Sequence, residues 1–303
     1  LRDHKAKLFE PWTGQIADEP QATRSGDETV GLATPPRLHK PQERVGPYTL
    51  LRLLGQGTFG VVWLAERRST LATTQVAIKF PLTTGLDLAK VKNEAQVWAR
   101  ASGHPNILPV IEADLYDGQV ALVSEYAPDG SLEAWLRQHR DPPPLLEVAV
   151  ALSSGIIAGL EHLHSRGLVH RDLKPANVLL QGNVPRIADF GLARLLYSSE
   201  QTCSIGGTPA YMAPEAWEGT RSELTDLWSA GVILYELLTG RRPFPQTELA
   251  ELRQAILTNE PSPLPKAFPL QLRELVQKAL SKNCSQRYGS AREMLSELQN
   301  VPS

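Results

Sequence analysis

The sequence is poor in cysteine, balanced in charge and without a long uninterrupted apolar run. Its 303 residues include only two cysteines, too few for a disulfide framework and without metal-site spacing. We therefore expect a reducing compartment and a cytoplasmic protein. Lys and Arg number 31 against 33 for Asp and Glu, which gives a net charge of -2. This balance excludes a strongly basic surface, so we expect no nucleic-acid partner.

We also expect no membrane segment in this chain. The most apolar stretch, Val148 to Leu160, is interrupted by Ser153, Ser154 and Gly155. The first residues lack the apolar core of a signal peptide. What is present is an ordinary globular composition, with 42% hydrophobic and 21% charged residues.

The hydrophobic pattern divides the chain into three parts. Residues 1–47 show no sustained helical or strand period and are rich in Pro, Gly, Thr and charge, which predicts a flexible extension. Residues 48–127 alternate like strands around one helical stretch near 88–101, and residues 128–303 have mostly helical spacing. The pattern therefore predicts an α+β protein. The helices expected in the last part lie at 132–138, with Ser131 as the cap, and at 145–164, 225–238, 247–258, 269–280 and 290–299.

The segment Gly55-Gln56-Gly57-Thr58-Phe59-Gly60 has G-x-G-x-x-G spacing. A dinucleotide-binding loop would open a helix, and a P-loop would end in Gly-Lys-Ser or Gly-Lys-Thr. Here the following residues, 61–66, alternate like a strand instead. The motif by itself leaves two readings open: a hairpin that lets backbone amides approach phosphate oxygens, or a merely tight turn.

Further motifs follow in a fixed order. They are Val76-Ala77-Ile78-Lys79, then Glu94, then His170-Arg171-Asp172-Leu173-Lys174-Pro175-Ala176-Asn177, then Asp189-Phe190-Gly191 and Ala213-Pro214-Glu215. From about residue 45 to 300 the sequence resembles a Hanks-type (eukaryotic-like) protein kinase. The resemblance implies the bilobal protein-kinase fold, with a flexible N-terminal extension at 1–47. A small β-rich N-lobe with one main helix and the hinge would occupy 48–127, and a larger α-helical C-lobe 128–303.

The resemblance also implies roles for individual residues. Asp172 would accept or orient the proton of a substrate hydroxyl, and Lys174 would neutralise the phosphate in transfer. Lys79 would hold the α- and β-phosphates of ATP, with Glu94 as its ion-pair partner. Asn177 and Asp189 would ligate Mg²⁺, with Mn²⁺ as an alternative, because such cations take oxygen ligands. The implied ATP-binding residues are Leu54, Gly55, Gly57, Gly60, Val62, Ala77, Lys79, Glu125, Ala127, Asn177 and Asp189.

Several motif residues are expected to be structural. His170 would prop the catalytic loop and pack near Phe190, with no role in proton transfer. Asp226 would brace the backbone of that loop. Glu215 and Arg287 would form a buried ion pair. Ser124 would stand at the gatekeeper position beside the adenine.

Lys174-Pro175 and the segment from Gly207 to Glu215 resemble serine/threonine kinases. The expected function is transfer of the ATP γ-phosphoryl group to Ser and Thr hydroxyls of proteins, including those of the kinase itself. One alternative is a pseudokinase or nucleotide-binding regulatory scaffold, and the intact Lys79, Asp172, Asn177 and Asp189 count against it. A second is a small-molecule kinase of related fold, which the glycine-rich loop and the Ala213-Pro214-Glu215 segment disfavour.

Phosphorylation sites are expected in two segments. Ser204 is the expected activating site, with Thr202 as the alternative, and Arg171 and Arg194 would bind the phosphate. The Thr208 hydroxyl would instead bond to Asp172 and Lys174. In the acidic stretch 26–32, Thr29 is either an autophosphorylation site for a phosphothreonine-binding partner or an inert threonine of the extension.

Overall fold

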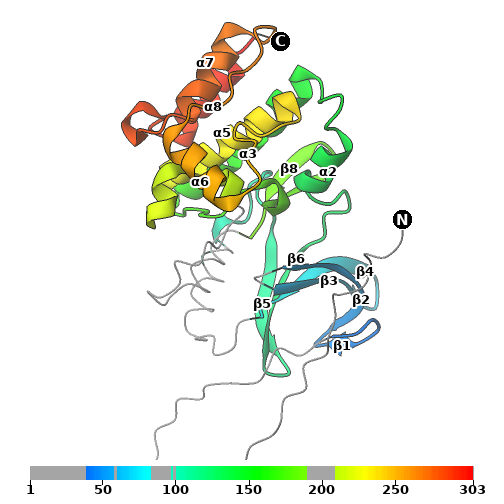
Figure 1. The fold of residues 1–303 in the computed structure, drawn as a ribbon. Coiled ribbons are helices and arrows are strands. Elements are labelled where there is room, and N and C mark those ends of the chain that lie inside the picture. The colour runs from blue at the N-terminus through cyan, green and yellow to red at the C-terminus, as the bar shows by residue number, and fades with distance from the viewer. Residues whose placement is uncertain (1–38, 58–59, 83–96, 98–99, 190–208, 303) are drawn as a thin grey trace, which may run out of the picture. The chain divides into compact units, whose positions relative to one another are not determined.

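The computed structural model describes residues 39–302 except for 58–59, 83–96, 98–99 and 190–208. Strands dominate the first part and helices the second (Figure 1), as predicted for an α+β fold. The strands are β1 (Arg44–Val45), β2 (Tyr48–Gly57), β3 (Gly60–Arg68), β4 (Thr73–Phe80), β5 (Val110–Tyr116), β6 (Gln119–Glu125), β7 (Val178–Gln181) and β8 (Val184–Ile187). The helices are α2 (Leu132–Gln138), α3 (Leu146–His164), α5 (Glu223–Thr239), α6 (Leu249–Thr258), α7 (Leu270–Ala279) and α8 (Ala291–Gln299). Short 3-10 helices are η1 (Pro175–Asn177), η2 (Pro209–Tyr211), η3 (Pro214–Glu218) and η4 (Cys284–Gln286).

The first part is an antiparallel sheet in the order β1-β2-β3-β4-β6-β5. Apolar side chains from neighbouring strands, among them Leu50, Ile78 and Val123, form its own fully buried core. β1 pairs Arg44 with Thr49, so the sheet begins ahead of the expected boundary at residue 48. The helix expected near 88–101 lies almost wholly outside the described residues.

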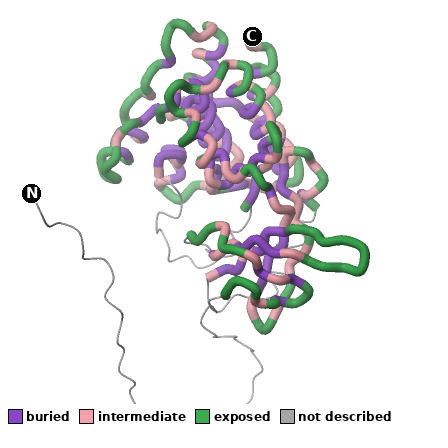
Figure 2. The backbone as a smooth tube through the Cα atoms, turned by 90° about the vertical axis from the view of Figure 1, so that its right-hand side faces the viewer, coloured by how far each residue is buried: buried purple, intermediate pink, exposed green. Residues whose placement is uncertain are grey.

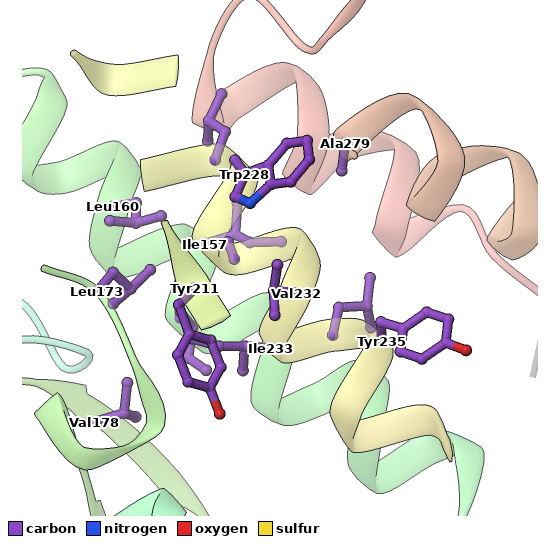
Figure 3. Close-up of a cluster of buried hydrophobic side chains, with 14 of the residues drawn as sticks. Ile157, Leu160, Leu173, Val178, Tyr211, Trp228, Val232, Ile233, Tyr235 and Ala279 are labelled. Atoms are coloured by element: carbon purple, nitrogen blue, oxygen red, sulfur yellow. The ribbon is translucent and has the colours of Figure 1, made fainter. Parts of the chain in front are cut away.

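The helical part is built around α5. Nearly every residue of α5 is buried, and a helix that is apolar on all sides belongs at the centre of a core. Trp228, Val232 and Ile233 of α5 pack with Ile157 and Leu160 of α3 (Figure 3). Buried residues accordingly run through the middle of the helical part (Figure 2).

Helix boundaries follow local signals closely. α2 spans 132–138 as predicted, and the Ser131 hydroxyl caps it by accepting from the Ala134 N–H at 3.3 Å. At the start of α5, Ser222 and Thr225 form a capping box. The remaining predicted helices differ from the observed ones by only a residue or two at their ends.

α3 has the length and composition to cross a membrane, with a mean hydropathy of 1.4, although interruptions by Ser and Gly argued against a span. In this structure it is a core helix. Its Leu152, Ile156 and Leu160 are buried against other parts of the helical core, and it packs on α5 and α8.

A second, two-stranded sheet of β7 and β8 was not anticipated from the pattern. It links the helical part to the loop before β5, because the Ile187 N–H donates to Asn106 O at 2.8 Å and the Leu108 N–H donates to Ile187 O at 2.9 Å. Since β8 leads almost directly to Asp189, these bonds fix the approach of that residue to the six-stranded sheet.

Candidate active site

The loop from His170 to Asn177 is braced by Asp226 of α5. The Asp226 carboxylate accepts from the backbone N–H groups of His170 at 2.8 Å and Arg171 at 2.9 Å. It also lies 2.9 Å from His164 Nε2, and its side chain is only 1% exposed. A buried carboxylate must be satisfied in this way, and here its partners fix the backbone just before Asp172. The predicted bracing role of Asp226 is confirmed.

Two of the predicted residues bond to the carboxylate of a third, Asp172. Asp172 Oδ2 accepts from Lys174 Nζ at 2.7 Å and from Asn177 Nδ2 at 3.2 Å. The same Asn177 amide nitrogen also donates to Asp172 O at 2.8 Å. An acceptor-only carboxylate beside an ammonium is the arrangement needed to orient a hydroxyl and to offset the charge of an incoming phosphate.

His170 is fully buried and both of its ring nitrogens have backbone partners. Nε2 lies 3.0 Å from Ala188 O, and Nδ1 accepts from the Asp172 N–H at 3.3 Å. This leaves the imidazole no free nitrogen for a substrate, in agreement with the expected structural role. Its expected neighbour Phe190 is outside the described residues.

Lys79 of β4 forms an ion pair with Asp189, two residues after the end of β8. Its Nζ lies 2.8 Å from Asp189 Oδ2, with the lysine side chain 13% exposed and the aspartate 37% exposed. Asp189 has φ 61°, a left-handed conformation that costs a non-glycine residue energy and that concentrates at functional sites. The predicted partner Glu94 lies outside the described residues, so that pairing stays a prediction.

The three described glycines of the glycine-rich hairpin differ in the space beside their Cα atoms. A Cβ added at Gly55 or Gly57 would meet nothing within 4 Å, so the space beside both is open. Gly60 has φ +156°, and a Cβ there would lie 2.6 Å from Phe80 O. The fold therefore requires glycine only at Gly60 among these three. The open space at the other two is what a close approach of phosphate groups to backbone amides needs.

The expected adenine-binding residues lie on adjacent strands and the hinge. Ala77 is 8% exposed and pairs with Ser124 across β4 and β6, while Ala127 is 7% exposed. The Glu125 N–H donates to Pro109 O at 3.1 Å, and the Glu125 carbonyl accepts from the Ser124 hydroxyl at 3.3 Å. Leu54 and Val62 are half-buried on β2 and β3.

Sequence reasoning missed several residues that contact the hinge. Leu108 and Ala188 form a small buried cluster with Ala127, which was predicted, and Leu179 packs against it. Arg186 of β8 pairs with Glu125 at 2.9 Å. Single apolar residues and one arginine form no motif, so only their position in space reveals them.

The donor set fits a divalent cation. Because the Asn177 amide nitrogen is used by Asp172, the amide oxygen is the atom that remains for a ligand. With the Asp189 carboxylate it offers the oxygen donors that Mg²⁺ prefers, to be completed by phosphate oxygens and water. Within the described ranges, no three His, Cys, Asp or Glu side chains gather into a protein-only metal cage.

Comparison with known proteins decides the family. The sequence model described as "Protein kinase domain" matches residues 48–298. The chain belongs to this family. Among curated relatives, serine/threonine-protein kinase PkaA of Streptomyces coelicolor is 37% identical over 261 residues, which cover 79% of this chain and 47% of the relative. Serine/threonine-protein kinase ATG1c of Arabidopsis thaliana is 35% identical over 256 residues, covering 80% and 34%. Serine/threonine-protein kinase Nek3 of Mus musculus is 34% identical over 243 residues, covering 79% and 47%.

The chain thus spans between a third and a half of the length of these relatives. Both the predicted Hanks-type resemblance and the predicted fold are confirmed by the family match and by the sheet and helices described above. The family uses ATP and a divalent metal ion in general.

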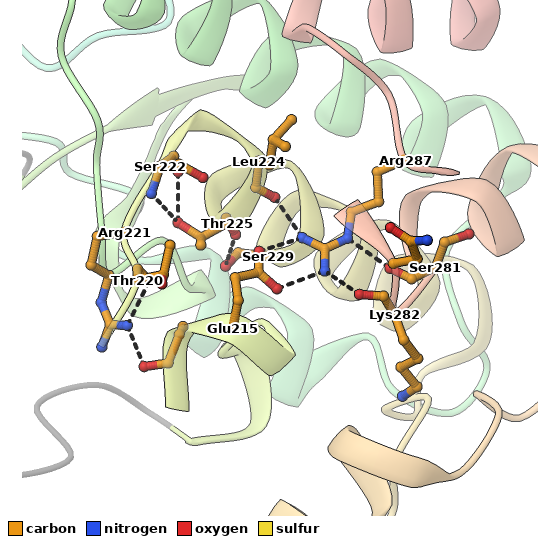
Figure 4. A network of polar contacts seen from close by, with 12 residues as sticks. Glu215, Thr220, Arg221, Ser222, Leu224, Thr225, Ser229, Ser281, Lys282 and Arg287 are labelled. Atoms are coloured by element: carbon orange, nitrogen blue, oxygen red, sulfur yellow. Dashed lines mark hydrogen bonds and ion pairs between the residues drawn. The ribbon is translucent and has the colours of Figure 1, made fainter. Parts of the chain in front are cut away.

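A largely buried ion pair joins η3 to the residue that follows η4. Arg287 donates from both terminal nitrogens to the two carboxylate oxygens of Glu215, at 2.6 and 2.7 Å, and its own side chain is 0% exposed (Figure 4). Its remaining donors go to the carbonyls of Ser281, Leu224 and Lys282. Burial acts to raise the pKa of Glu215, but the bonds from Arg287 outweigh it and hold that pKa below its usual value. The predicted pair is confirmed.

Arg171 has a cationic neighbour that the sequence analysis did not single out. Burial lowers the pKa of Arg221, and the charge of Arg171 lowers it further. Arg221 itself donates to the carbonyls of Ala216 and Thr220. Thr29, Arg194, Thr202, Ser204 and Thr208 lie outside the described residues, so their roles stay predictions.

Proposed function

We propose that this kinase domain transfers the γ-phosphoryl group of ATP to Ser and Thr hydroxyls of proteins, its own included. The observation that carries the proposal is the cluster of Asp172, Lys174 and Asn177 on one loop, together with the Lys79–Asp189 ion pair. Phosphoryl transfer is mainly positioning and electrostatic stabilisation, and these two groups of side chains supply both.

In this mechanism Asp172 orients the substrate hydroxyl and takes its proton. The Lys174 ammonium offsets negative charge on the phosphate oxygens. Lys79 binds the α- and β-phosphates, with Glu94 as its further partner. The Lys79 ammonium lies 2.8 Å from the Asp189 carboxylate, so the phosphate-binding and metal-binding side chains stand side by side.

We propose Mg²⁺ as the metal ion, held by the Asn177 amide oxygen and Asp189. When bound, the ion neutralises phosphate charge. The adenine would lie between Ala77 and Val62 on one side and the hinge backbone at Glu125 and Ala127, with Leu54 at the entrance. Gly55, Gly57 and Gly60 would cover the phosphates.

Phosphate transfer itself is tested with γ-labelled ATP and a set of peptides that differ only in carrying Ser, Thr or Tyr. Incorporation into the Ser and Thr peptides with Mg²⁺, and not into the Tyr peptide, supports the proposal. Binding of ATP without any transfer would instead show a pseudokinase. Repeating the assay with Mn²⁺ identifies the more effective metal.

We further propose that phosphorylation of Ser204, or of Thr202 in its place, activates the domain. Arg171 and Arg194 would bind the phosphate through charge-assisted bonds, while Thr208 bonds to Asp172 and Lys174. Phosphatase treatment should lower activity and ATP should restore it. Full activity of a Ser204→Ala, Thr202→Ala variant would refute this step.

Thr29 is proposed as an autophosphorylation site for a phosphothreonine-binding partner. Mass spectrometry of active enzyme tests it directly, and the absence of phosphate between residues 20 and 40 would exclude it.

A further inference from the structure

A cavity of about 650 Å³ lies beside η2, just after the segment 190–208. Its walls come from three parts of the C-lobe. These are Arg140 in the connection from α2 to α3, Pro209 and Ala210 of η2, and the stretch from Gly240 to the start of α6. The cavity thus lies near the C-terminal ends of α2 and α5 and the N-terminal end of α6.

The cavity is lined by positive charge. Arg140, Arg241 and Arg242 contribute to its wall, and none of its described lining residues is Asp or Glu. Arg140 and Arg241 are exposed and form no ion pair with a residue that the structure describes. Arg242 differs, because its Nε lies 3.9 Å from a Glu236 oxygen and its guanidinium is 6.0 Å from the Tyr211 ring centroid.

Two carboxylates near the cavity are already engaged, and Glu248, between Thr247 and Leu249 of the wall, is exposed and does not line it. Glu236 is buried and accepts from the Tyr211 hydroxyl at 2.6 Å. Glu133 on α2 pairs with Arg137 at 3.0 Å. The charge of Arg140 and Arg241 is therefore left for a ligand.

The wall also has a polar atom without a partner. Gln246 Oε1 is buried and has no hydrogen-bond partner among the described residues. Beside it stand Phe244, Pro245 and Leu249. An unpaired buried acceptor next to apolar side chains suits a peptide, whose backbone N–H can donate to it while its side chains contact the apolar wall.

The cavity is held rigid on its charged side. Gly240 ends α5 with φ +68°, and a Cβ there would collide with the carbonyl oxygen of Arg140. This close approach places the backbone of Arg140 next to that of Arg241. Two guanidinium groups on one rigid edge can bind a carboxylate or phosphate with several donors at once.

α5 connects this cavity to the catalytic loop. Ser229 of α5 donates its hydroxyl to Tyr211 O at 2.8 Å and so positions η2, while Asp226, on the preceding turn, braces the loop that carries Asp172. The same helix therefore positions both the loop that carries Asp172 and η2, which lines the cavity.

We propose that this cavity binds an acidic side chain, carboxylate or phosphate, that flanks the acceptor in a peptide substrate. The proposal rests on the proposed kinase function and names its substrate class: Ser/Thr peptides with a nearby negative charge. The chain itself contains such a sequence, because Asp27 and Glu28 directly precede Thr29.

The test compares kcat/KM for synthetic Ser peptides in which one Asp is moved through the flanking positions, each matched to a peptide with Asn there. A second series carries phosphothreonine, with Thr as its match, and separates a phosphate preference from a carboxylate one. At one position at least, the acidic peptide should react about fivefold faster, since exposed charge pairs contribute modestly. Arg140→Gln with Arg241→Gln should bring this ratio close to one.

Arg253→Gln is the matched control. Arg253 is exposed on α6 but does not line the cavity, so its loss should leave the ratio unchanged. The Arg140→Glu, Arg241→Glu variant should reverse the preference in favour of peptides with Lys at the same position. Such a reversal cannot come from misfolding, and a thermal unfolding midpoint equal to that of the parent serves as the second check.

Equal rates for acidic and neutral peptides, or a preference that survives both arginine changes, would overturn the inference and leave the kinase activity intact. A failure to phosphorylate any Ser or Thr peptide would instead overturn the proposed function. The two failures are thus distinguishable in one assay.

Discussion

The loop at residues 170–177 and the glycine-rich hairpin, to which Gly55, Gly57 and Gly60 belong, would both contact ATP or its acceptor in the proposed function, but they are held by different means. Asp226 bonds to two backbone N–H groups of the loop, and the ring of His170 bonds to Ala188 and Asp172. The hairpin has open space beside Gly55 and Gly57 and a tight contact at Gly60 alone. A base must hold its geometry through the reaction, whereas a phosphate cover must leave room for its ligand.

The largest effect is expected from a change in the loop at residues 170–177. Asp172→Asn should reduce kcat by on the order of 10²–10⁴, because the amide cannot take the hydroxyl proton. ATP binding, measured by fluorescence or calorimetry, should remain close to that of the parent, since Asp172 faces the hydroxyl. Turnover above about a tenth of the parent value would contradict the assignment.

The next largest effect is expected on the stability of the C-lobe, through the Glu215–Arg287 ion pair. Arg287→Ala removes the partner of Glu215, whose side chain is only 15% exposed, which should lower the free energy of unfolding in urea by up to about 3–5 kcal/mol. Because Arg287 holds the Glu215 pKa low, the stabilisation should be present above the usual carboxyl pKa and be lost as pH falls through the lower folded value.

Arg292→Ala is its control. Arg292 also pairs with a carboxylate, Glu161 at 2.7 Å, but its side chain is 81% exposed. Its loss should change stability by less than about 1 kcal/mol. Equal effects for the two arginines would show that burial does not set the value of the Glu215 pair.

The hairpin offers a pair of matched glycine changes. Gly60→Ala should cost on the order of 1–3 kcal/mol of stability, because of its backbone conformation and the contact with Phe80 O. Gly57→Ala should leave stability within about 0.5 kcal/mol of the parent and raise the KM for ATP instead. If Gly57→Ala destabilised the domain as much as Gly60→Ala, the contrast between ligand-required and fold-required glycines would fail.

The smallest effect is a pH dependence in the C-lobe. Lys282 Nζ lies 4.2 Å from the Phe244 ring centroid and donates to Ile256 O at 2.6 Å, and burial lowers its pKa to about 8. Between pH 8 and about 10 the unfolded chain keeps this proton while the folded one loses it, so stability should rise with pH in that window. Lys282→Met should flatten this rise in urea unfolding curves. An unchanged slope would show that Lys282 titrates normally.

The motifs and helix ends were open to prediction because they depend on neighbours in the sequence. Ser131 caps α2 through a bond within one turn, and Asp172, Lys174 and Asn177 meet because they share one loop. The resemblance to protein kinases extended this to Asp226 and the Glu215–Arg287 pair, whose partners are far apart in the chain.

Other features depended on the tertiary structure. The link from Arg186 to Glu125 and the proximity of Arg221 to Arg171 join single residues that belong to no motif. The contact between Lys79 and Asp189 also pairs two residues whose expected partners were phosphate and metal.

By itself, the sequence determined the kinase family, the order of the elements and the candidate catalytic side chains, because these depend on local motifs and hydrophobic period. Only the tertiary structure decided that Arg140 and Arg241 share one cavity. Their charges carry no periodic signal, and they are brought together by the close approach of Gly240 to the Arg140 backbone.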